Sequence, residues 1–207
     1  MKLNGLTMLH HVWRRLLACS ELDECIVSIG DGPDSWRLVD EALSIGARAS
    51  VGHLDDLIQR HCVAAHEMRV DAIVRVRADC VFISPKYIDD VAAIYRREYP
   101  KVRGLVNWPD RTISEGLDFE LFSMGLMRQL EDTKDCPRED FATWVIERGF
   151  EHQLAKWGID YPPIGQDLHL SVDTKDDANR AERMLKWLGS NDRWSYSETI
   201  AAYEATK

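Results

Sequence analysis

The stretch DAIVRVRADCVFISP, residues 71–85, is the most informative part of the sequence for the fold class. It begins with the apolar, β-branched run 72–76, which is typical of a buried strand. The run ends before Asp79, and Ser84-Pro85 then predicts a helix, because a hydroxyl N-cap followed by proline is a common helix start. This order places Asp79 just beyond the carboxyl end of a strand, which is the edge where open α/β sheets bind ligands.

A second stretch repeats this pattern near the far end of the chain. Residues 168–172, LHLSV, are predicted to form a strand that runs into Asp173 and Thr174, with a helix after them. Two aspartates at strand ends could share one Mg²⁺, which proteins commonly hold with one or two carboxylates and substrate phosphates. The alternative stays open at each position, because aspartate is also favoured at helix caps and turns.

The rest of the chain alternates between predicted strands and helices, which is typical of βαβ units. Strands are expected at residues 24–29, 48–51, 102–107, 119–122 and 151–157. Helices are expected at residues 7–19, 34–44, 55–68, 85–98, 123–130 and 137–149, then from Asp173 or Thr174 to Leu188, and finally after Ser197. Residues 108–117 are expected to form a long loop of the kind that often carries function.

Composition limits the protein class. The 207 residues are enough for one domain with a substantial core, and 45% apolar with 29% charged residues is ordinary for a soluble globular protein. A net charge of −9 argues against binding to nucleic acid or to anionic membranes. No apolar run approaches the roughly 18 residues of a membrane span, and basic residues interrupt any signal peptide. Five cysteines without Cys-x-x-Cys spacing predict reduced thiols in a cytoplasmic protein.

Six segments occur in an order that is characteristic of one enzyme family. They are GLTMLHHV (5–12), DDLIQRH (55–61), RVRADC with ISP (75–85), EGLDFELFS (115–123), PRED (137–140) and SVDTKDD (171–177). Together they resemble cytidylyltransferases of the spore-coat polysaccharide type, relatives of the acylneuraminate and Kdo cytidylyltransferases. The resemblance covers about residues 5–185. It departs from the family pattern at Val81, Ser84 and Asp140.

The resemblance implies a three-layer α/β/α domain over residues 1–207, with a mostly parallel sheet of the Rossmann-like nucleotide-diphospho-sugar transferase type. Helices in about residues 174–205 are expected to pack on this domain. The implied activity is transfer from CTP to an acidic or modified sugar, giving a CMP-sugar and pyrophosphate. A homodimer is also implied.

The resemblance further suggests site residues. Asp79 and Asp173 are the implied catalytic residues and ligands of Mg²⁺ (or Mn²⁺). The implied substrate-binding residues are Arg60, Arg75, Glu115, Asp118, Glu120 and Arg138. Each has a structural alternative: an ion pair for Arg75, a solvated helix face for Arg60, an exposed strand face for the acidic residues, and a first helical turn for Arg138. The seven histidines suggest no metal-ligand set.

One family feature does not occur in the sequence. Family members begin with a strand and an R-x-x-S-x-R-L-P-x-K loop that holds the triphosphate, and this sequence starts after that point. In a doubly wound sheet the first strand usually lies centrally, so its loss would leave unpaired backbone groups on both neighbours. Either the chain is an incomplete part of a longer protein, or the other strands close the gap, or a partner fills it.

Two other functions stay open. The first is a non-catalytic, sugar- or nucleotide-binding subunit that acts with a complete partner. The second is a glycosyltransferase that uses a sugar nucleotide. It ranks third, because such enzymes usually hold their metal with an Asp-x-Asp pair and the sequence after Asp79 is Cys80-Val81.

Overall fold

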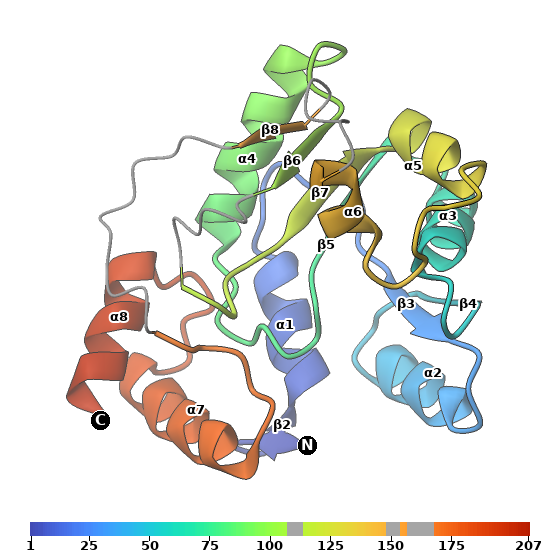
Figure 1. Ribbon diagram of the computed structural model, residues 1–207. Helices are drawn as coiled ribbons and strands as arrows, with labels where there is room; N and C mark the ends of the chain where they lie inside the picture. Colours follow the sequence, from blue (N-terminus) through green and yellow to red (C-terminus); the bar gives the residue numbers. More distant parts are fainter. Residues whose placement is uncertain (107–113, 148–153, 157–167) are drawn as a thin grey trace.

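The computed structural model describes residues 1–106, 114–147, 154–156 and 168–207, which form an α/β fold with helices around the strands (Figure 1). The strands are β1 (Lys2–Leu3), β2 (Leu6–Thr7), β3 (Val27–Gly30), β4 (Ala49–Gly52), β5 (Ala72–Arg75), β6 (Gly104–Val106), β7 (Glu120–Ser123) and β8 (Leu154–Lys156). The helices are α1 (Met8–Leu16), α2 (Ser35–Ser44), α3 (Leu57–Met68), α4 (Pro85–Glu98), α5 (Met124–Glu131), α6 (Phe141–Glu147), α7 (Lys175–Leu188) and α8 (Tyr196–Ala205).

The strands form a short hairpin and two separate sheets. The hairpin joins β1 to β2, one sheet pairs β3 with β4 in parallel, and the other has the order β5-β7-β6-β8. In the larger sheet, β7 runs antiparallel to both of its neighbours. The α/β class is confirmed, but the described sheets are mixed rather than mostly parallel. The direction of β7 follows from its connection, because no described helix crosses over between β6 and β7.

The core has two main parts, one on each face of the larger sheet. Leu105 and Leu121 contact a cluster that includes side chains of α1, α4, α7 and α8. Their neighbours in sequence, Val106 and Phe122, contact a cluster built on α3, α5 and α6. Successive side chains of a strand point to opposite faces, so this division is what a sheet between two helical layers produces.

A large groove separates the two sheets. No described strand pairs β3 with β5, and the space between them is an open groove of about 1300 Å³. Residues of both strands line it, and so do apolar residues of α1 such as Leu9, Val12 and Leu16. The described strands therefore form two separate sheets, and none of them bridges the space between β3 and β5.

The helix starts show which local predictions are correct. Ser84 caps α4 through a hydrogen bond from the Tyr87 amide, with Pro85 at the start, as predicted. Thr174 caps α7 in a capping box. The cap of α3 is Asp56 rather than Asp55, and the cap of α8 is Ser195 rather than Ser197. In each of these pairs the predicted and observed residues have the same capping chemistry and lie within two positions of each other.

Two predicted elements are different in the structure. Residues 168–172 do not form a strand, since their one ladder contact is an isolated parallel bridge between His169 and Glu115. Helix α6 begins at Phe141 instead of Pro137. The predicted loop 108–117, strand 151–157 and the end of helix 137–149 lie partly outside the described residues.

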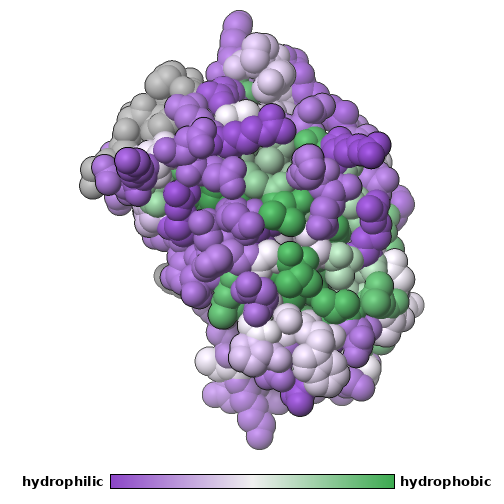
Figure 2. Space-filling view, turned by 90° about the vertical axis from the view of Figure 1, so that its right-hand side faces the viewer, coloured by the Kyte–Doolittle hydropathy of each residue, from purple (hydrophilic) through white to green (hydrophobic). Residues whose placement is uncertain are grey.

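The surface is mostly polar on the side of the molecule that carries α2, α3 and α5, with one region of apolar residues (Figure 2). Exposed apolar side chains of α2, β4 and the residue stretch after β4 include Leu38, Leu43, Val51 and Leu54. Among the described residues, no helix combines the length and the apolar character that crossing a membrane requires.

Candidate functional site

In the turn after β5, the Asp79 carboxylate lies beside the Arg77 guanidinium. The Asp79 carboxylate accepts a hydrogen bond from Arg77 Nε at 3.1 Å and lies 3.1 Å from Arg77 Nη2. About a quarter of its side chain is exposed, so it remains accessible from solvent. The neighbouring Cys80 is buried, and burial together with the charge of Asp79 raises the pKa of its thiol. The thiol therefore stays protonated at neutral pH and is a poor nucleophile.

Two other segments meet this turn through backbone hydrogen bonds. The Val172 amide donates to the Asp79 carbonyl at 3.1 Å, which joins the segment before α7 to the β5 turn. The Leu170 amide donates to the Glu115 carbonyl at 2.8 Å, which joins the same segment to the residues before β7. Residues from three distant parts of the sequence therefore form one site at the carboxyl end of β5.

Gly116 allows the close approach of two of these segments. Its φ is +88°, and a Cβ at this position would lie 2.1 Å from the Ser171 nitrogen and 2.4 Å from the Leu170 carbonyl carbon. Those atoms belong to the backbone and cannot rotate away. Glycine is therefore required both for the conformation and for the contact.

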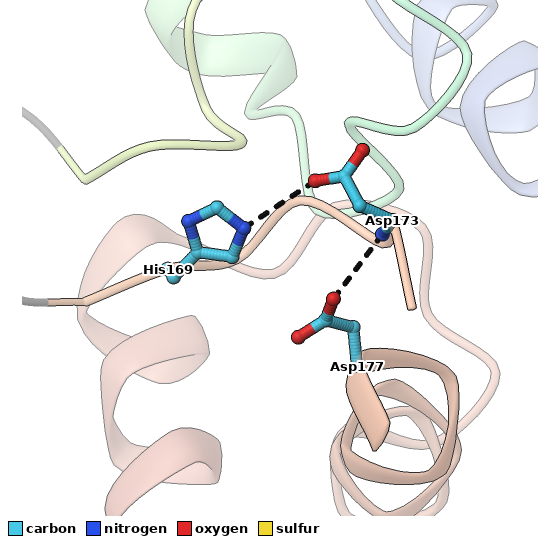
Figure 3. A group of neighbouring side chains, drawn as sticks. All are labelled: His169, Asp173 and Asp177. Atoms are coloured by element: carbon cyan, nitrogen blue, oxygen red, sulfur yellow. Dashed lines mark hydrogen bonds and ion pairs between the residues drawn. The ribbon is translucent and has the colours of Figure 1, made fainter. Parts of the chain in front are cut away.

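His169, Ser171 and Asp173 make a polar row along the segment before α7. The Ser171 hydroxyl donates to Asp173 Oδ2 at 2.7 Å, and His169 Nε2 lies 3.3 Å from the same oxygen, as Figure 3 shows for the histidine. The other ring nitrogen, Nδ1, lies 3.2 Å from Glu115 Oε2. The imidazole thus sits between two carboxylates, and half of the Asp173 side chain remains exposed.

Asp177 fixes this row from the first turn of α7. Its Oδ2 accepts hydrogen bonds from the Thr174 amide at 2.9 Å and the Thr174 hydroxyl at 2.7 Å, and it lies 3.3 Å from the Asp173 amide (Figure 3). Arg180 Nη2 donates to Asp177 Oδ1 at 2.6 Å and to the His169 carbonyl at 2.8 Å. Burial alone would raise the pKa of Asp177, but the bonds from Thr174 and Arg180 outweigh it and lower the pKa to about 2.

His169, Asp173 and Asp177 offer ligand atoms within 4.8 Å of one another. Asp177 is nevertheless a structural residue, because both of its oxygens already accept hydrogen bonds. The side chains that remain available at this point are His169 and Asp173.

Arg75 and Glu120 form an ion pair across the β5–β7 ladder. Their side chains lie opposite each other in register, with Nη1 and Oε2 2.5 Å apart and about a fifth or less of either side chain exposed. Burial raises the pKa of Glu120, and the charge of Arg75 opposes that shift. Of the two predicted roles for Arg75, the structure shows the ion pair.

The other predicted substrate residues lie in different surroundings. Arg60 is half-buried near Gly30 and donates to the Leu54 carbonyl at 3.0 Å, and burial lowers its pKa. Asp118 lies close enough to Glu120 for its charge to raise the pKa of that carboxyl. Arg138 donates to the carbonyls of Leu130 and Glu131 at the end of α5, so its guanidinium supports a helix end.

Sequence reasoning missed His169, Ser171 and Arg77 as members of this site. The first two were assigned to a strand without a role, and no histidine was placed in a ligand set. A signal was present, because positions 169, 171 and 173 alternate and therefore share one face of an extended segment. The proximity of Glu115 and Asp79 carried no such local signal.

Comparisons with known proteins agree with this fold. A family model described as cytidylyltransferase matches residues 1–115. A cytidylyltransferase structure from Leptospira borgpetersenii serovar Hardjo-bovis (strain JB197) has a TM-score of 0.91 and 22% identity, covering 99% of this chain and 86% of that one. No curated protein matches the sequence.

Two further solved structures are similar over most of the chain. A CMP:2-keto-3-deoxy-manno-octonic acid synthetase complexed with CTP has a TM-score of 0.57 and 13% identity, covering 76% of this chain and 80% of that one. Rv0371C from Mycobacterium tuberculosis H37Rv, in complex with manganese, has a TM-score of 0.58 and 18% identity, covering 87% and 88%. At these identities the likeness shows a shared nucleotidyltransferase, Rossmann-like fold.

Proposed function

The chain belongs to the cytidylyltransferase family, and we propose that it transfers the cytidylyl group of CTP to an acidic or modified sugar, releasing pyrophosphate. One observation carries the proposal: the Val172 amide bonds to the Asp79 carbonyl at 3.1 Å. This bond brings the segments of Asp79 and Asp173 side by side beyond the carboxyl end of β5. That edge is where α/β sheets bind their ligands.

The acidic groups at this edge suit a divalent cation. Asp173 offers carboxylate oxygens within 4.8 Å of a ring nitrogen of His169, and Mn²⁺ accepts nitrogen more readily than Mg²⁺ does. Asp79 lies outside this group and would join it only through the phosphates of CTP or through a movement of its side chain. Asp173 has the accessibility that a ligand needs, since half of its side chain is exposed. When bound, the cation would neutralise negative charge on the phosphates of CTP.

The protein's own groups would position the reactants. Ser171 and His169 orient the Asp173 carboxylate, and Glu115 holds the His169 ring from its other side. Arg77 compensates the charge of Asp79 in the free protein. In the reaction, a sugar oxygen forms a bond to the α-phosphorus while the bond from that phosphorus to pyrophosphate breaks. Such transfers depend mainly on positioning and electrostatics.

The remaining predicted residues fall into two groups in this proposal. Glu115 and Asp118, in the residues before β7, would face the sugar, and Arg60, beside the end of β3, would lie near the base or the sugar. Arg75, Glu120 and Arg138 stabilise the fold in this proposal. Arg75 and Glu120 form an ion pair with each other, and Arg138 donates to carbonyls at the end of α5.

The proposal is tested by calorimetric titration of CTP into the 207-residue chain, with Mg²⁺ and separately with Mn²⁺. Asp79→Asn and Asp173→Asn should each weaken binding by tenfold or more, and Asp176→Asn, an exposed first-turn residue of α7, should not. Pyrophosphate release is then assayed with acidic sugars. A folded wild-type chain that binds no CTP with either metal would refute the proposal.

A second candidate is a binding subunit of the same fold that acts with a complete partner. The open groove beside β5 favours it, because no described strand pairs with the edge of β5 that faces away from β7. This candidate predicts binding of CTP or sugar without turnover. The sequence argues against the glycosyltransferase alternative, since the buried Val81 stands where an Asp-x-Asp pair would have its second carboxylate.

A further inference from the structure

Two carboxylates of the candidate site lack an arginine or lysine partner. Among the described residues, Glu115 and Asp173 form ion pairs only with His169. By contrast, the nearby Asp79 and Asp177 each have an arginine beside them, at 3.1 and 2.6 Å. This part of the site therefore carries negative charge that no described arginine or lysine compensates.

The contacts around His169 need more protons than the neutral side chains supply. Nδ1 lies 3.2 Å from Glu115 Oε2, and Nε2 lies 3.3 Å from Asp173 Oδ2, toward which Figure 3 shows the ring directed. The Ser171 hydroxyl lies 2.9 Å from Nε2, but it donates its one proton to Asp173 Oδ2 at 2.7 Å. A neutral imidazole has one N–H and one bare lone pair, whereas both carboxylates only accept. One ring nitrogen therefore faces a carboxylate oxygen without a proton between them.

A metal ion between His169 and Asp173 would satisfy these contacts together. Nδ1–H would donate to Glu115, and the lone pairs of Nε2 and Asp173 Oδ2 would both point at the ion. Histidines that bind metals almost always donate their other ring N–H to a carboxylate, a carbonyl or water, which fixes the ring and makes the ligating nitrogen more basic. Glu115 has the position of such an orienting carboxylate.

The spacing of the two ligand atoms suits one shared ion. Ligands about 2.1 Å from an octahedral ion, at right angles to each other, lie roughly 3.0 Å apart. Nε2 and Oδ2 are 3.3 Å apart. Half of the Asp173 side chain is exposed, so the other coordination positions would be open to water and to phosphate oxygens.

The backbone holds the orienting carboxylate in place. Glu115 and His169 form a parallel bridge, and the Leu170 amide donates to the Glu115 carbonyl at 2.8 Å. Arg180 donates to the His169 carbonyl, also at 2.8 Å. The ring and its carboxylate partner are therefore positioned by contacts that do not involve the ion.

A nitrogen ligand changes which metal the site prefers. Carboxylate oxygens and water suit Mg²⁺ and Mn²⁺ alike, whereas imidazole suits transition metals better than Mg²⁺. We propose that His169 Nε2 binds the metal ion directly beside Asp173, that Glu115 orients the ring, and that this nitrogen gives the site a preference for Mn²⁺ over Mg²⁺. The inference rests on the proposed function for the presence of a divalent cation.

Pulsed EPR of the 207-residue chain with bound Mn²⁺ tests the ligand directly, because it detects a nitrogen bonded to the ion. Spectra are recorded with Mn²⁺ alone and with Mn²⁺ and CTP. Titration with Mn²⁺, and competition by Mg²⁺, give the two dissociation constants. The variants are His169→Gln, Glu115→Gln and Asp173→Asn, and His66→Gln, at an exposed histidine of α3, is the control.

The wild type and His66→Gln should show the nitrogen coupling, and His169→Gln should lose it. His169→Gln should weaken Mn²⁺ binding by about tenfold or more and Mg²⁺ binding by roughly threefold at most. Asp173→Asn should weaken both ions by about tenfold or more, because a carboxylate serves either one. Glu115→Gln should keep the nitrogen coupling but weaken Mn²⁺ binding about tenfold.

Two results would overturn the inference. The first is Mn²⁺ bound to the wild type without nitrogen coupling, as expected if the His169 ring carries protons on both nitrogens. The second is an unchanged ratio of Mn²⁺ to Mg²⁺ affinity in His169→Gln.

The same measurements separate this inference from the proposed function. Binding of CTP with Mn²⁺ but without nitrogen coupling would keep the function and refute the role of His169. Nitrogen coupling in a chain that binds no CTP would do the reverse. Absence of Mn²⁺ binding, with and without CTP, would refute both.

Discussion

Replacing Asp177 by Asn should destabilise the protein and loosen the candidate site together. Asp177 is nine-tenths buried at the start of α7, where it accepts bonds from Thr174 and Arg180. Arg180 also holds the His169 carbonyl. Asparagine keeps the shape but loses the charge and one acceptor oxygen. The hydrogen bonds that Thr174 and Arg180 donate to this side chain are therefore weakened or lost.

The size of the effect follows from the pKa of Asp177. The pKa falls from an ordinary 3.8 to about 2 in the folded protein. Each pKa unit corresponds to about 1.4 kcal/mol, so the ionised carboxylate contributes on the order of 2 kcal/mol to the free energy of unfolding. Loss of a capping interaction alone costs typically about 1 kcal/mol, so a value on the order of 2 kcal/mol is consistent with a capping-box carboxylate that also accepts from Arg180.

The lowered pKa of Asp177 also determines how the free energy of unfolding depends on pH. Because the folded pKa lies below the unfolded one, the stabilisation is fully present above about pH 4 to 5 and is lost as the pH falls toward 2. At pH 3, roughly half of the difference between wild type and Asp177→Asn should remain. The variant has no carboxylate at this position, so its own stability curve should be flatter over this range.

Urea unfolding at pH 7, 5, 4 and 3 measures this difference directly, with Asp176→Asn as the control. Asp176 also lies in the first turn of α7 but is exposed, so its change should stay within about 0.5 kcal/mol at every pH. A pH-independent difference for Asp177→Asn, or equal losses in the two variants, would refute the reasoning.

Two further predictions concern the contacts that hold the site. Arg75→Met should cost about 3 kcal/mol of unfolding free energy, because it leaves the Glu120 carboxyl buried without its cation; Arg97→Met, which breaks an exposed pair, is the control. Gly116→Ala should cost more than Gly46→Ala, since both glycines have positive φ but only the Cβ at position 116 would meet backbone. Urea midpoints measure both differences, and equal losses at the two glycines would show that the segments can separate.

Local features of the fold were predictable where neighbouring residues determine them. Residues 72–76 suggested a strand, and β5 spans Ala72–Arg75. Ser84-Pro85 set the start of α4 because hydroxyl cap and proline act within one turn. The choice between Asp55 and Asp56 was not predictable in this way. Both residues can cap, and in the structure it is the Asp56 side chain that accepts a hydrogen bond from the Gln59 amide.

Contacts between distant segments could not be predicted from local patterns. The pairing of Arg75 with Glu120 depends on the register of β5 and β7, which lie far apart in sequence. The row of His169, Ser171 and Asp173 could have been recognised as one face of an extended segment. Its meeting with Glu115 depends on the backbone approach at Gly116, which no periodicity reveals.

Strand β5 connects the groove to the candidate site. One of its edges is fixed to β7, its other edge faces the groove, and its carboxyl end leads into the turn of Asp79. The turn of Asp79 is held from two directions, because β5 is paired with β7 and the Val172 amide donates to the Asp79 carbonyl at 3.1 Å. The position of Asp79 therefore depends on long-range pairing as well as on the residues of its own turn.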